Sequence, residues 1–278
     1  MGLYIGERRT CAGNGGNVAR FHAFEFHELG FFPATWRDLL TELMSFYARL
    51  LHPYRHVAPM LAEALEDVGG NRIVDLCSGA GSPLLSLLPV LEETLGGRLE
   101  VVLTDKFPNV GALRALADDS GGAIKTVLEP VDAMAVPPEL RGFRTIFTAF
   151  HHFRESEARA ILEDAVRLEQ GIGIFEYTER NFLIWTLPLL LTPLAILFAT
   201  PFVRPFRFSR LLWTYLIPVV PFAALWDGFA SCLRTYSTGE LWKLTESLGA
   251  SNYAWRIGRV PSLGASHVTF LIGTPEGG

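Results

Sequence analysis

The residues RIVDLCSGAGSPLLSLL at positions 72–88 decide the fold of this chain. Arg72–Leu76 is a short apolar run that predicts a buried strand, and Pro83–Leu95 has the pattern of a helix. Gly79 and Gly81 lie between them, and glycine tolerates the positive φ that such an abrupt turn requires. The amides at the start of the helix would then face an anionic group, such as the carboxylate of an amino acid.

Strands and helices continue to alternate after this segment. The further predicted strands are Leu99–Thr104, Ile124–Glu129, Thr145–Ala149, Gly171–Phe175, and two late strands near Tyr253–Val260 and His267–Ile272; the further helices are Val110–Ser120, Glu155–Leu168 and Thr238–Leu248. Such alternation is built from right-handed crossovers between parallel strands. We therefore expect an α/β fold with a Rossmann-like, doubly wound, mostly parallel sheet of seven strands.

The predicted core is interrupted by regions of other composition. Apolar side chains between Leu39 and Leu51 recur at three- and four-residue spacing, which predicts a helix, and Val57–Leu65 predicts a second one. The expected organisation is a flexible tail (1–20), an N-terminal helical cap (21–68), a core (69–180 and 227–278) and a hydrophobic helical insertion after strand five (181–226).

Composition excludes several classes of function. The net charge of −5 gives no general attraction to nucleic acid, and no nucleic-acid partner is expected. Cys11, Cys77 and Cys232 lie far apart, which argues against a disulfide framework and against a zinc site, so no metal is predicted. The N-terminus lacks the apolar core of a signal peptide, and a reducing cytoplasmic location fits these features.

Carboxylates follow three of the predicted strands. Asp75 ends the first strand and can accept a hydrogen bond from a cationic amino group. Asp105 ends the second, where a carboxylate can bridge two ribose hydroxyls, and Asp132 follows the third, where it can accept from an adenine amino group. Ligands of doubly wound sheets bind at these carboxyl ends, so the order of the acids predicts a nucleoside-binding cleft.

These motifs resemble those of the class I S-adenosylmethionine-dependent methyltransferases over residues 72–177 and again over the last forty or so residues. Cys77 departs from the pattern, because many family members have the first glycine of the loop there. The segments 150–153 (FHHF) and 226–236 further resemble a bacterial subgroup of this family. The resemblance implies roles in binding S-adenosylmethionine for Asp75, Gly79, Gly81, Asp105 and Asp132. The predicted cofactor site also includes Cys77, Ser78, Lys106, Ala133, Thr148 and Phe150.

Three other functions compete with methyl transfer. A dinucleotide oxidoreductase would need glycine or alanine at position 84 to complete its fingerprint, and Leu84 stands there instead. A catalytically idle scaffold would bind S-adenosylmethionine without transferring its methyl group. A membrane-associated interaction protein would bind neither cofactor.

Methyl transfer needs a base when the acceptor carries a proton. His151 and His152, after the fourth strand, are the first candidates, because histidine titrates near neutrality. The alternative is that one of them caps the next helix and the other lines the adenosine site. Tyr177 is a further catalytic candidate. Glu176, Arg234 and Tyr236 are the candidates for substrate contacts.

The insertion contains two stretches without charge, 181–203 and 211–226, with Arg204, Arg207 and Arg210 between them. A two-pass membrane hairpin is disfavoured, because it would carry three arginines through lipid at about 2.5–3.5 kcal/mol each. The insertion can instead enter one leaflet with its arginines at lipid phosphates, cover the cleft as a lid, or pack in a homodimer. The first two predict a hydrophobic small-molecule or lipid acceptor, and the first a protein peripheral to the inner face of a membrane.

Overall fold

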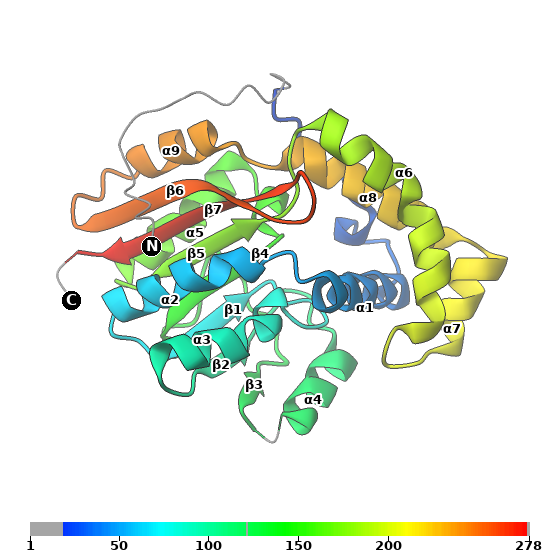
Figure 1. The fold of residues 1–278 in the computed structure, drawn as a ribbon, viewed down its shortest axis with the longest axis horizontal. Coiled ribbons are helices and arrows are strands. Elements are labelled where there is room, and N and C mark those ends of the chain that lie inside the picture. The colour runs from blue at the N-terminus through cyan, green and yellow to red at the C-terminus, as the bar shows by residue number, and fades with distance from the viewer. Residues whose placement is uncertain (1–18, 121, 277–278) are drawn as a thin grey trace.

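The computed structural model describes residues 19–120 and 122–276, so most of the predicted tail lies outside the described residues. Seven strands form one sheet in the order β3-β2-β1-β4-β5-β7-β6, in which β7 runs antiparallel to both of its neighbours (Figure 1). The strands are β1 (Arg72–Leu76), β2 (Glu100–Leu103), β3 (Ile124–Thr126), β4 (Phe143–Phe147), β5 (Ile172–Glu176), β6 (Tyr253–Pro261) and β7 (His267–Pro275). The predicted seven-strand, mostly parallel, Rossmann-like sheet is confirmed.

Helices cover both faces of this sheet and extend from one side of it (Figure 1). The α-helices are α1 (Ala34–Leu51), α2 (Ala58–Asp67), α3 (Leu88–Leu95), α4 (Val110–Asp119), α5 (Glu155–Arg167), α6 (Phe182–Ala199), α7 (Phe208–Leu211), α8 (Val219–Arg234) and α9 (Thr238–Glu246). The short helical turns are η1 (Phe26–Glu28), η2 (Arg55–Val57), η3 (Pro83–Ser86), η4 (Phe150–His152), η5 (Thr200–Phe202) and the π-helical η6 (Leu212–Leu216).

The core is divided by the sheet because successive residues of a strand point to opposite faces. In β1, Ile73 belongs to the cluster that includes Leu61 of α2 and Leu91 of α3. Its neighbour Val74 belongs to the opposite cluster, with Ile161 of α5 and Leu241 of α9. Both faces of β1 are therefore buried, which explains its continuous apolar run.

The chain changes direction across the sheet at β1. It passes from β1 outward to β2 and β3 and then returns to β4, which pairs with the other edge of β1. The loops after β1 and β4 therefore leave the sheet on either side of a switch point, where ligands of doubly wound folds bind.

Some predicted boundaries are wrong for identifiable reasons. The helix expected over Pro83–Leu95 is divided into η3 and α3, because Pro89 has no amide hydrogen to continue the first segment and instead lies in the first turn of α3. The strand expected over Thr145–Ala149 begins earlier and ends at Phe147, because Thr148 adopts a φ of 46°.

The insertion packs against the cap. Leu39 and Leu43 of α1 share a core cluster with Ile196, Val203 and Val220 of the insertion. Figure 1 shows α1 between the sheet and the helices α6, α7 and α8. The domain boundary predicted between residues 226 and 227 falls inside α8, so the insertion and the core share one continuous helix.

The expectation that all three insertion arginines meet lipid phosphates is wrong for two of them. Arg207 lies 2.7 Å from a carboxylate oxygen of Glu42 on α1, and Arg210 binds the other oxygen of the same carboxylate. Arg204 is exposed. The pairing of Arg207 and Arg210 fixes the turn between α6 and α8 to the cap.

Candidate functional site

The loop after β1 adopts the left-handed conformations that its sequence predicts. Cys77, Gly79 and Gly81 have φ values of 59°, 57° and 129°. A Cβ atom on Gly81 would lie 2.8 Å from Cδ1 of Leu116, so a side chain there would be strained by φ and would require the end of Leu116 to move. The hydroxyl of Ser45 on α1 donates to the carbonyl of Gly81 at 2.8 Å. The cap therefore contacts the glycine loop directly.

Asp75 lies buried beneath this loop. Its carboxylate accepts hydrogen bonds of 2.6 Å from the hydroxyls of Ser78 and Thr145. Burial raises the pKa of Asp75 to about 6, although these two donors oppose the shift. In this arrangement Asp75 joins the loop to β4, and its predicted contact with the amino group of a cofactor stays a prediction.

The other two strand-end acids lie beside the loop. The amide of Gly79 donates to Oδ2 of Asp105 at 2.7 Å, so the acid after β2 binds the glycine turn directly. Lys106 lies 2.8 Å from Oδ2 of Asp132, whose Oδ1 accepts from the amide of Met134 at 3.0 Å. The structure thus brings the acids after β2 and β3 to the same edge of the sheet as the loop.

The remaining predicted cofactor residues have different surroundings. Ala133 is buried in the α5 side of the core. The hydroxyl of Thr148 hydrogen-bonds that of Tyr54. The ring of Phe150 is fully buried, 5.5 Å from the ring of Tyr236. Phe150 is therefore a core residue here, and its predicted cofactor contact stays a prediction.

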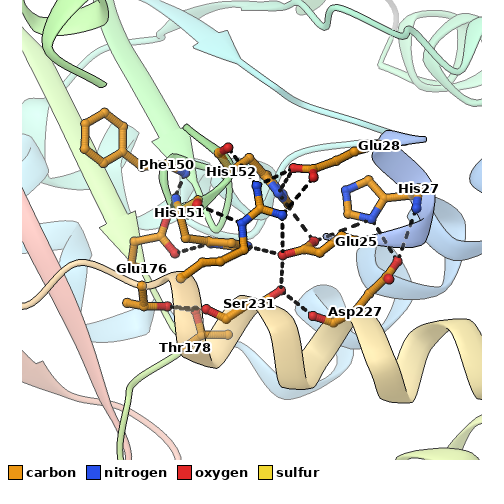
Figure 2. Close-up of polar contacts among 12 residues, drawn as sticks. Glu25, His27, Glu28, Phe150, His151, His152, Glu176, Thr178, Asp227 and Ser231 are labelled. Carbon is orange, nitrogen blue, oxygen red and sulfur yellow. Dashed lines mark hydrogen bonds and ion pairs between the residues drawn. The ribbon is translucent and has the colours of Figure 1, made fainter. Parts of the chain in front are cut away.

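His151 and Glu176 form a buried pair at the end of β4 (Figure 2). Nδ1 of His151 lies 2.8 Å from Oε2 of Glu176, and Oε1 of the same carboxylate accepts from the amide of Phe150 at 2.6 Å. Burial alone would raise the pKa of Glu176, but the adjacent His151 lowers it overall. A carboxylate on Nδ1 fixes the orientation and tautomer of the imidazole, which leaves Nε2 as the free nitrogen.

His152 faces the N-terminal segment. Its Nδ1 lies 3.0 Å from Oε1 of Glu28 and 3.4 Å from Oε2 of Glu25. Burial lowers the pKa of His152, so the neutral imidazole is favoured. The helix α5 begins with a hydrogen bond from the Arg154 amide to the Glu157 carboxylate, so neither histidine caps it.

Arg234 and Tyr236 connect protein segments to one another. The guanidinium of Arg234 is fully buried, binds both carboxylate oxygens of Glu28 at 2.8 and 2.7 Å, and donates to the carbonyl of His152 at 2.7 Å. The hydroxyl of Tyr236 donates to the carbonyl of Phe153 at 2.9 Å. The contacts of Arg234 hold Glu28 against η4, and the predicted substrate contacts of both residues stay predictions.

Tyr177 is separated from the histidine pair. Residues 176 and 177 point to opposite faces, so Tyr177 packs between the rings of Tyr54 and Trp185, at centroid distances of 6.4 and 4.9 Å. Burial raises the pKa of Tyr177. The structure therefore brings together His151, His152, Glu176 and Arg234, but not Tyr177.

Four acidic or imidazole side chains of this cluster were missed from sequence. Glu25, His27 and Glu28 come from the N-terminal segment, and Asp227 comes from α8 (Figure 2). Asp227 accepts from the amide of Phe26 at 2.6 Å and lies 2.9 Å from Nδ1 of His27. The available signals in the sequence were the alternation of aromatic and polar residues over 24–27 and the position of Asp227 within the segment 226–236.

An apolar groove lies between α6 and α8. Its volume is about 440 Å³. The groove is lined by Phe182, Thr186, Leu189, Leu190, Phe222, Leu225, Trp226 and Phe229. Trp226 also donates to the carbonyl of Phe24 at 2.9 Å, so the groove begins next to the polar cluster in sequence and in space.

Comparisons with known proteins identify the fold. No family model matches the sequence, and no curated protein matches it significantly. Among solved structures, the plantazolicin methyltransferase BpumL in complex with S-adenosylhomocysteine has a TM-score of 0.53 at 11% identity, over 87% of this chain and 96% of that chain. The O-methyltransferase NcsB1 from neocarzinostatin biosynthesis, solved with S-adenosylmethionine and a naphthoic acid, has a TM-score of 0.49 at 17% identity, over 84% of this chain and 56% of that chain.

The mitomycin 7-O-methyltransferase MmcR has a TM-score of 0.45 at 17% identity, over 80% of this chain and 54% of that chain. This chain thus spans little more than half the length of NcsB1 or MmcR. Its similarity to BpumL extends over nearly the whole of both chains. The chain has the fold of the class I S-adenosylmethionine-dependent methyltransferases.

Proposed function

We propose that this protein transfers the methyl group of S-adenosylmethionine to a hydrophobic small-molecule or lipid-like acceptor. The observation that carries this proposal is the hydrogen bond of 2.7 Å between the Gly79 amide and Asp105. It joins the glycine turn to the acid expected to bind ribose, at the switch point of a methyltransferase fold. The presence of S-adenosylhomocysteine in the BpumL structure supports the same cofactor.

The chemistry requires alignment more than activation. The sulfonium leaving group is already reactive, so the protein chiefly has to place nucleophile, methyl carbon and sulfur in line and exclude water, which contributes several kcal/mol or more. The cap supports such closure, because Ser45 of α1 binds the glycine loop. A base is needed only if the acceptor atom carries a proton.

The apolar groove supports a hydrophobic acceptor. Its lining is almost entirely aromatic and aliphatic, as is usual for pockets that bury small molecules. Helix α6, which lines one side of the groove, also exposes large apolar side chains to solvent, including Leu183 at 96% and Phe198 at 78%. Among the described residues, Phe182–Phe202 is long and apolar enough to cross a membrane, and one bent helix pair passes the same test.

We infer from these exposed side chains that the insertion contacts a membrane surface, which would make the protein peripheral on the cytoplasmic side. The expected result is that the full chain floats with liposomes and that the variant Leu183→Asp/Phe198→Asp floats much less. Val90→Asp, a change of an exposed apolar residue on α3, is the matched control. Equal flotation of all three proteins, or none, would remove the membrane clause.

Calorimetry tests the cofactor. The wild type should bind S-adenosylmethionine and S-adenosylhomocysteine in preference to NAD. Replacing Asp105 by Ala should weaken binding by roughly 1.5–3 kcal/mol for each charge-assisted hydrogen bond that is lost. Asp118→Asn, on the exposed side of α4, should bind like the wild type. Unchanged affinity in Asp105→Ala, or preferential NAD binding, would refute the proposed cofactor site.

A further inference from the structure

A buried cluster of carboxylates and imidazoles lies where the N-terminal segment crosses the end of β4 (Figure 2). Its central group is Glu25, which is fully buried. Ligand atoms of Glu25, His151 and His152 all lie within 4.8 Å of one another. The three side chains come from two segments more than a hundred residues apart in sequence, so their convergence is a product of the fold.

The separations within this trio differ from those of hydrogen bonds. Nε2 of His151 lies 3.7 Å from Oε1 of Glu25, and Nδ1 of His152 lies 3.4 Å from Oε2 of Glu25. Hydrogen bonds between nitrogen and oxygen are about 2.7–3.2 Å long. Two ligands of a tetrahedral ion with bonds of about 2.1 Å are separated by about 3.4 Å. These two separations run to different oxygens of the Glu25 carboxylate, and both are closer to ligand–ligand spacing than to hydrogen bonding.

Two atoms of the trio lack a partner. Within residues 19–120 and 122–276, neither Nε2 of His151 nor Oε2 of Glu25 makes a hydrogen bond. Leaving a buried polar atom unpaired costs about 1–3 kcal/mol. His151 is at the same time held by Glu176 through Nδ1 at 2.8 Å. A carboxylate on the second ring nitrogen is the usual outer partner of a histidine that binds a metal.

Carboxylates are numerous in this cluster. Those of Glu25, Glu28, Glu176 and Asp227 pair with Arg234 or with a neighbouring imidazole. Arg234 binds both oxygens of Glu28 and lies 3.2 Å from Oε1 of Glu25, so Oε2 is the oxygen of Glu25 that has no hydrogen bond among the described residues. Buried charges are normally paired or coordinate metals, and a divalent cation would bind this remaining oxygen.

We propose that Glu25, His151 and His152 bind a divalent transition-metal ion that fastens the N-terminal segment over the end of β4. Two imidazoles and one carboxylate suit a borderline first-row ion such as Zn²⁺ better than Mg²⁺ or Ca²⁺. Three protein ligands leave one position open, as in catalytic zinc sites. A metal on Nε2 of His151 excludes that nitrogen as the general base.

A second trio, formed by Glu25, His27 and Asp227, also has metal-ligand spacing. Nδ1 of His27 and Oδ2 of Asp227 are already 2.9 Å apart, which is a normal hydrogen-bond distance. Their partnership is thus complete without an ion. Nδ1 of His152 in the first trio is likewise 3.0 Å from Glu28, so the choice rests on Nε2 of His151, which has no hydrogen bond within the part of the chain that the structure describes and belongs only to the first trio. The structure assigns the metal to that trio, and His27 and Asp227 orient the segment around Glu25.

Metal titration of the full chain tests the assignment. The protein is treated with a chelator and dialysed, and Zn²⁺ is then titrated in competition with a chromophoric chelator. We expect one tight equivalent and a higher Tm with the ion. Glu25→Gln and His152→Gln should each weaken binding by more than about 100-fold, and Glu176→Gln by about 10- to 100-fold. His56→Gln, an exposed histidine outside the cluster, should bind like the wild type.

Several outcomes would overturn the metal site. These are the absence of a stoichiometric equivalent in the wild type, equal affinity in folded His152→Gln, or a thiolate charge-transfer band in the Co²⁺ form, which would place the ion on cysteine. Near-UV circular dichroism identifies any variant that fails to fold. If His152→Gln does not fold, the Zn²⁺ affinity of Glu176→Gln decides, because glutamine keeps an oxygen that can accept from the backbone amides. Asp105→Ala should still bind the metal, so a failure of the proposed cofactor site can be distinguished from a failure of the metal site.

Discussion

Removing the carboxylate of Glu42 should detach the insertion from the cap. Glu42 is almost fully buried on α1, where it binds Arg207 at 2.7 Å and Arg210 through its other oxygen. It also accepts from the side-chain amide of Asn109, the residue that caps α4, at 3.3 Å. One carboxylate therefore joins the cap, the insertion and a core helix, and the substitution Glu42→Ala would remove all of these contacts.

The expected loss of stability follows from what remains. Arg210 is also buried, and without Glu42 its guanidinium keeps a hydrogen bond of 2.9 Å to the carbonyl of Val203 but no counter-charge. Breaking a buried ion pair from one side costs about 3–5 kcal/mol. Total unfolding free energies are about 5–15 kcal/mol, so the loss would be a large fraction of the whole.

Urea unfolding measures this loss. Trp36 of the cap and Trp213 of the insertion lie 4.9 Å apart, so tryptophan fluorescence reports on the interface while far-UV circular dichroism reports on the whole chain. The double variant Glu42→Leu/Arg210→Met should be more stable than Glu42→Leu, because it removes the uncompensated charge. The control is Glu63→Ala, whose carboxylate is 61% exposed and lies 2.8 Å from Arg256.

An exposed pair contributes about 0–1 kcal/mol, so Glu63→Ala should be nearly neutral. If Glu42→Ala lost no more stability than Glu63→Ala, or if the double variant were the least stable of the set, the argument from buried charge would be refuted.

Two further predictions concern the glycine loop. Because the pKa of Asp75 is raised to about 6 from 3.8, its contribution to stability is present below pH 4 and is lost as the pH rises through 6; Asp75→Asn should gain about 3 kcal/mol relative to the wild type between pH 4 and pH 7 in urea titrations, and a constant difference would contradict the raised pKa. Gly79→Ala should cost about 1–2 kcal/mol for its left-handed φ alone. Gly81→Ala should cost more, since a φ of 129° lies outside the left-handed region that alanine can adopt and the end of Leu116 would also have to move; the reverse order in the same titrations would show that the loop has another conformation.

Local sequence was sufficient to predict the sheet and the glycine turn after β1. The apolar run of β1 reports burial on both faces, as the opposite locations of Ile73 and Val74 confirm. The glycines report a turn that needs positive φ, and the structure has it. Cys77 shares this conformation at φ 59°, which shows that the loop geometry persists where the family pattern lacks its glycine.

Long-range pairing could not be predicted in the same way. Hydrophobic periodicity does not indicate that Glu42 will meet Arg210, 168 positions later, or that Glu25 will lie beside His151. Cations in an otherwise apolar segment indicate contacts with lipid phosphates, but the sequence does not indicate that a carboxylate on a distant helix will bind them. Partners of buried charges are set by packing, which one sequence does not reveal.

The boundary predicted at residue 226 follows the charge distribution, but α8 continues across it and has two faces of different polarity. Asp227, Ser231 and Arg234 are spaced by four and three residues, so they share one face of α8, and that face binds the N-terminal segment. The groove-lining residues of α8, which are Phe222, Leu225, Trp226 and Phe229, have the same spacing on another face. The apolar groove and the polar cluster are thus two sides of one rigid element. If the groove binds the proposed acceptor and the cluster holds the proposed ion, both would act on the same helix.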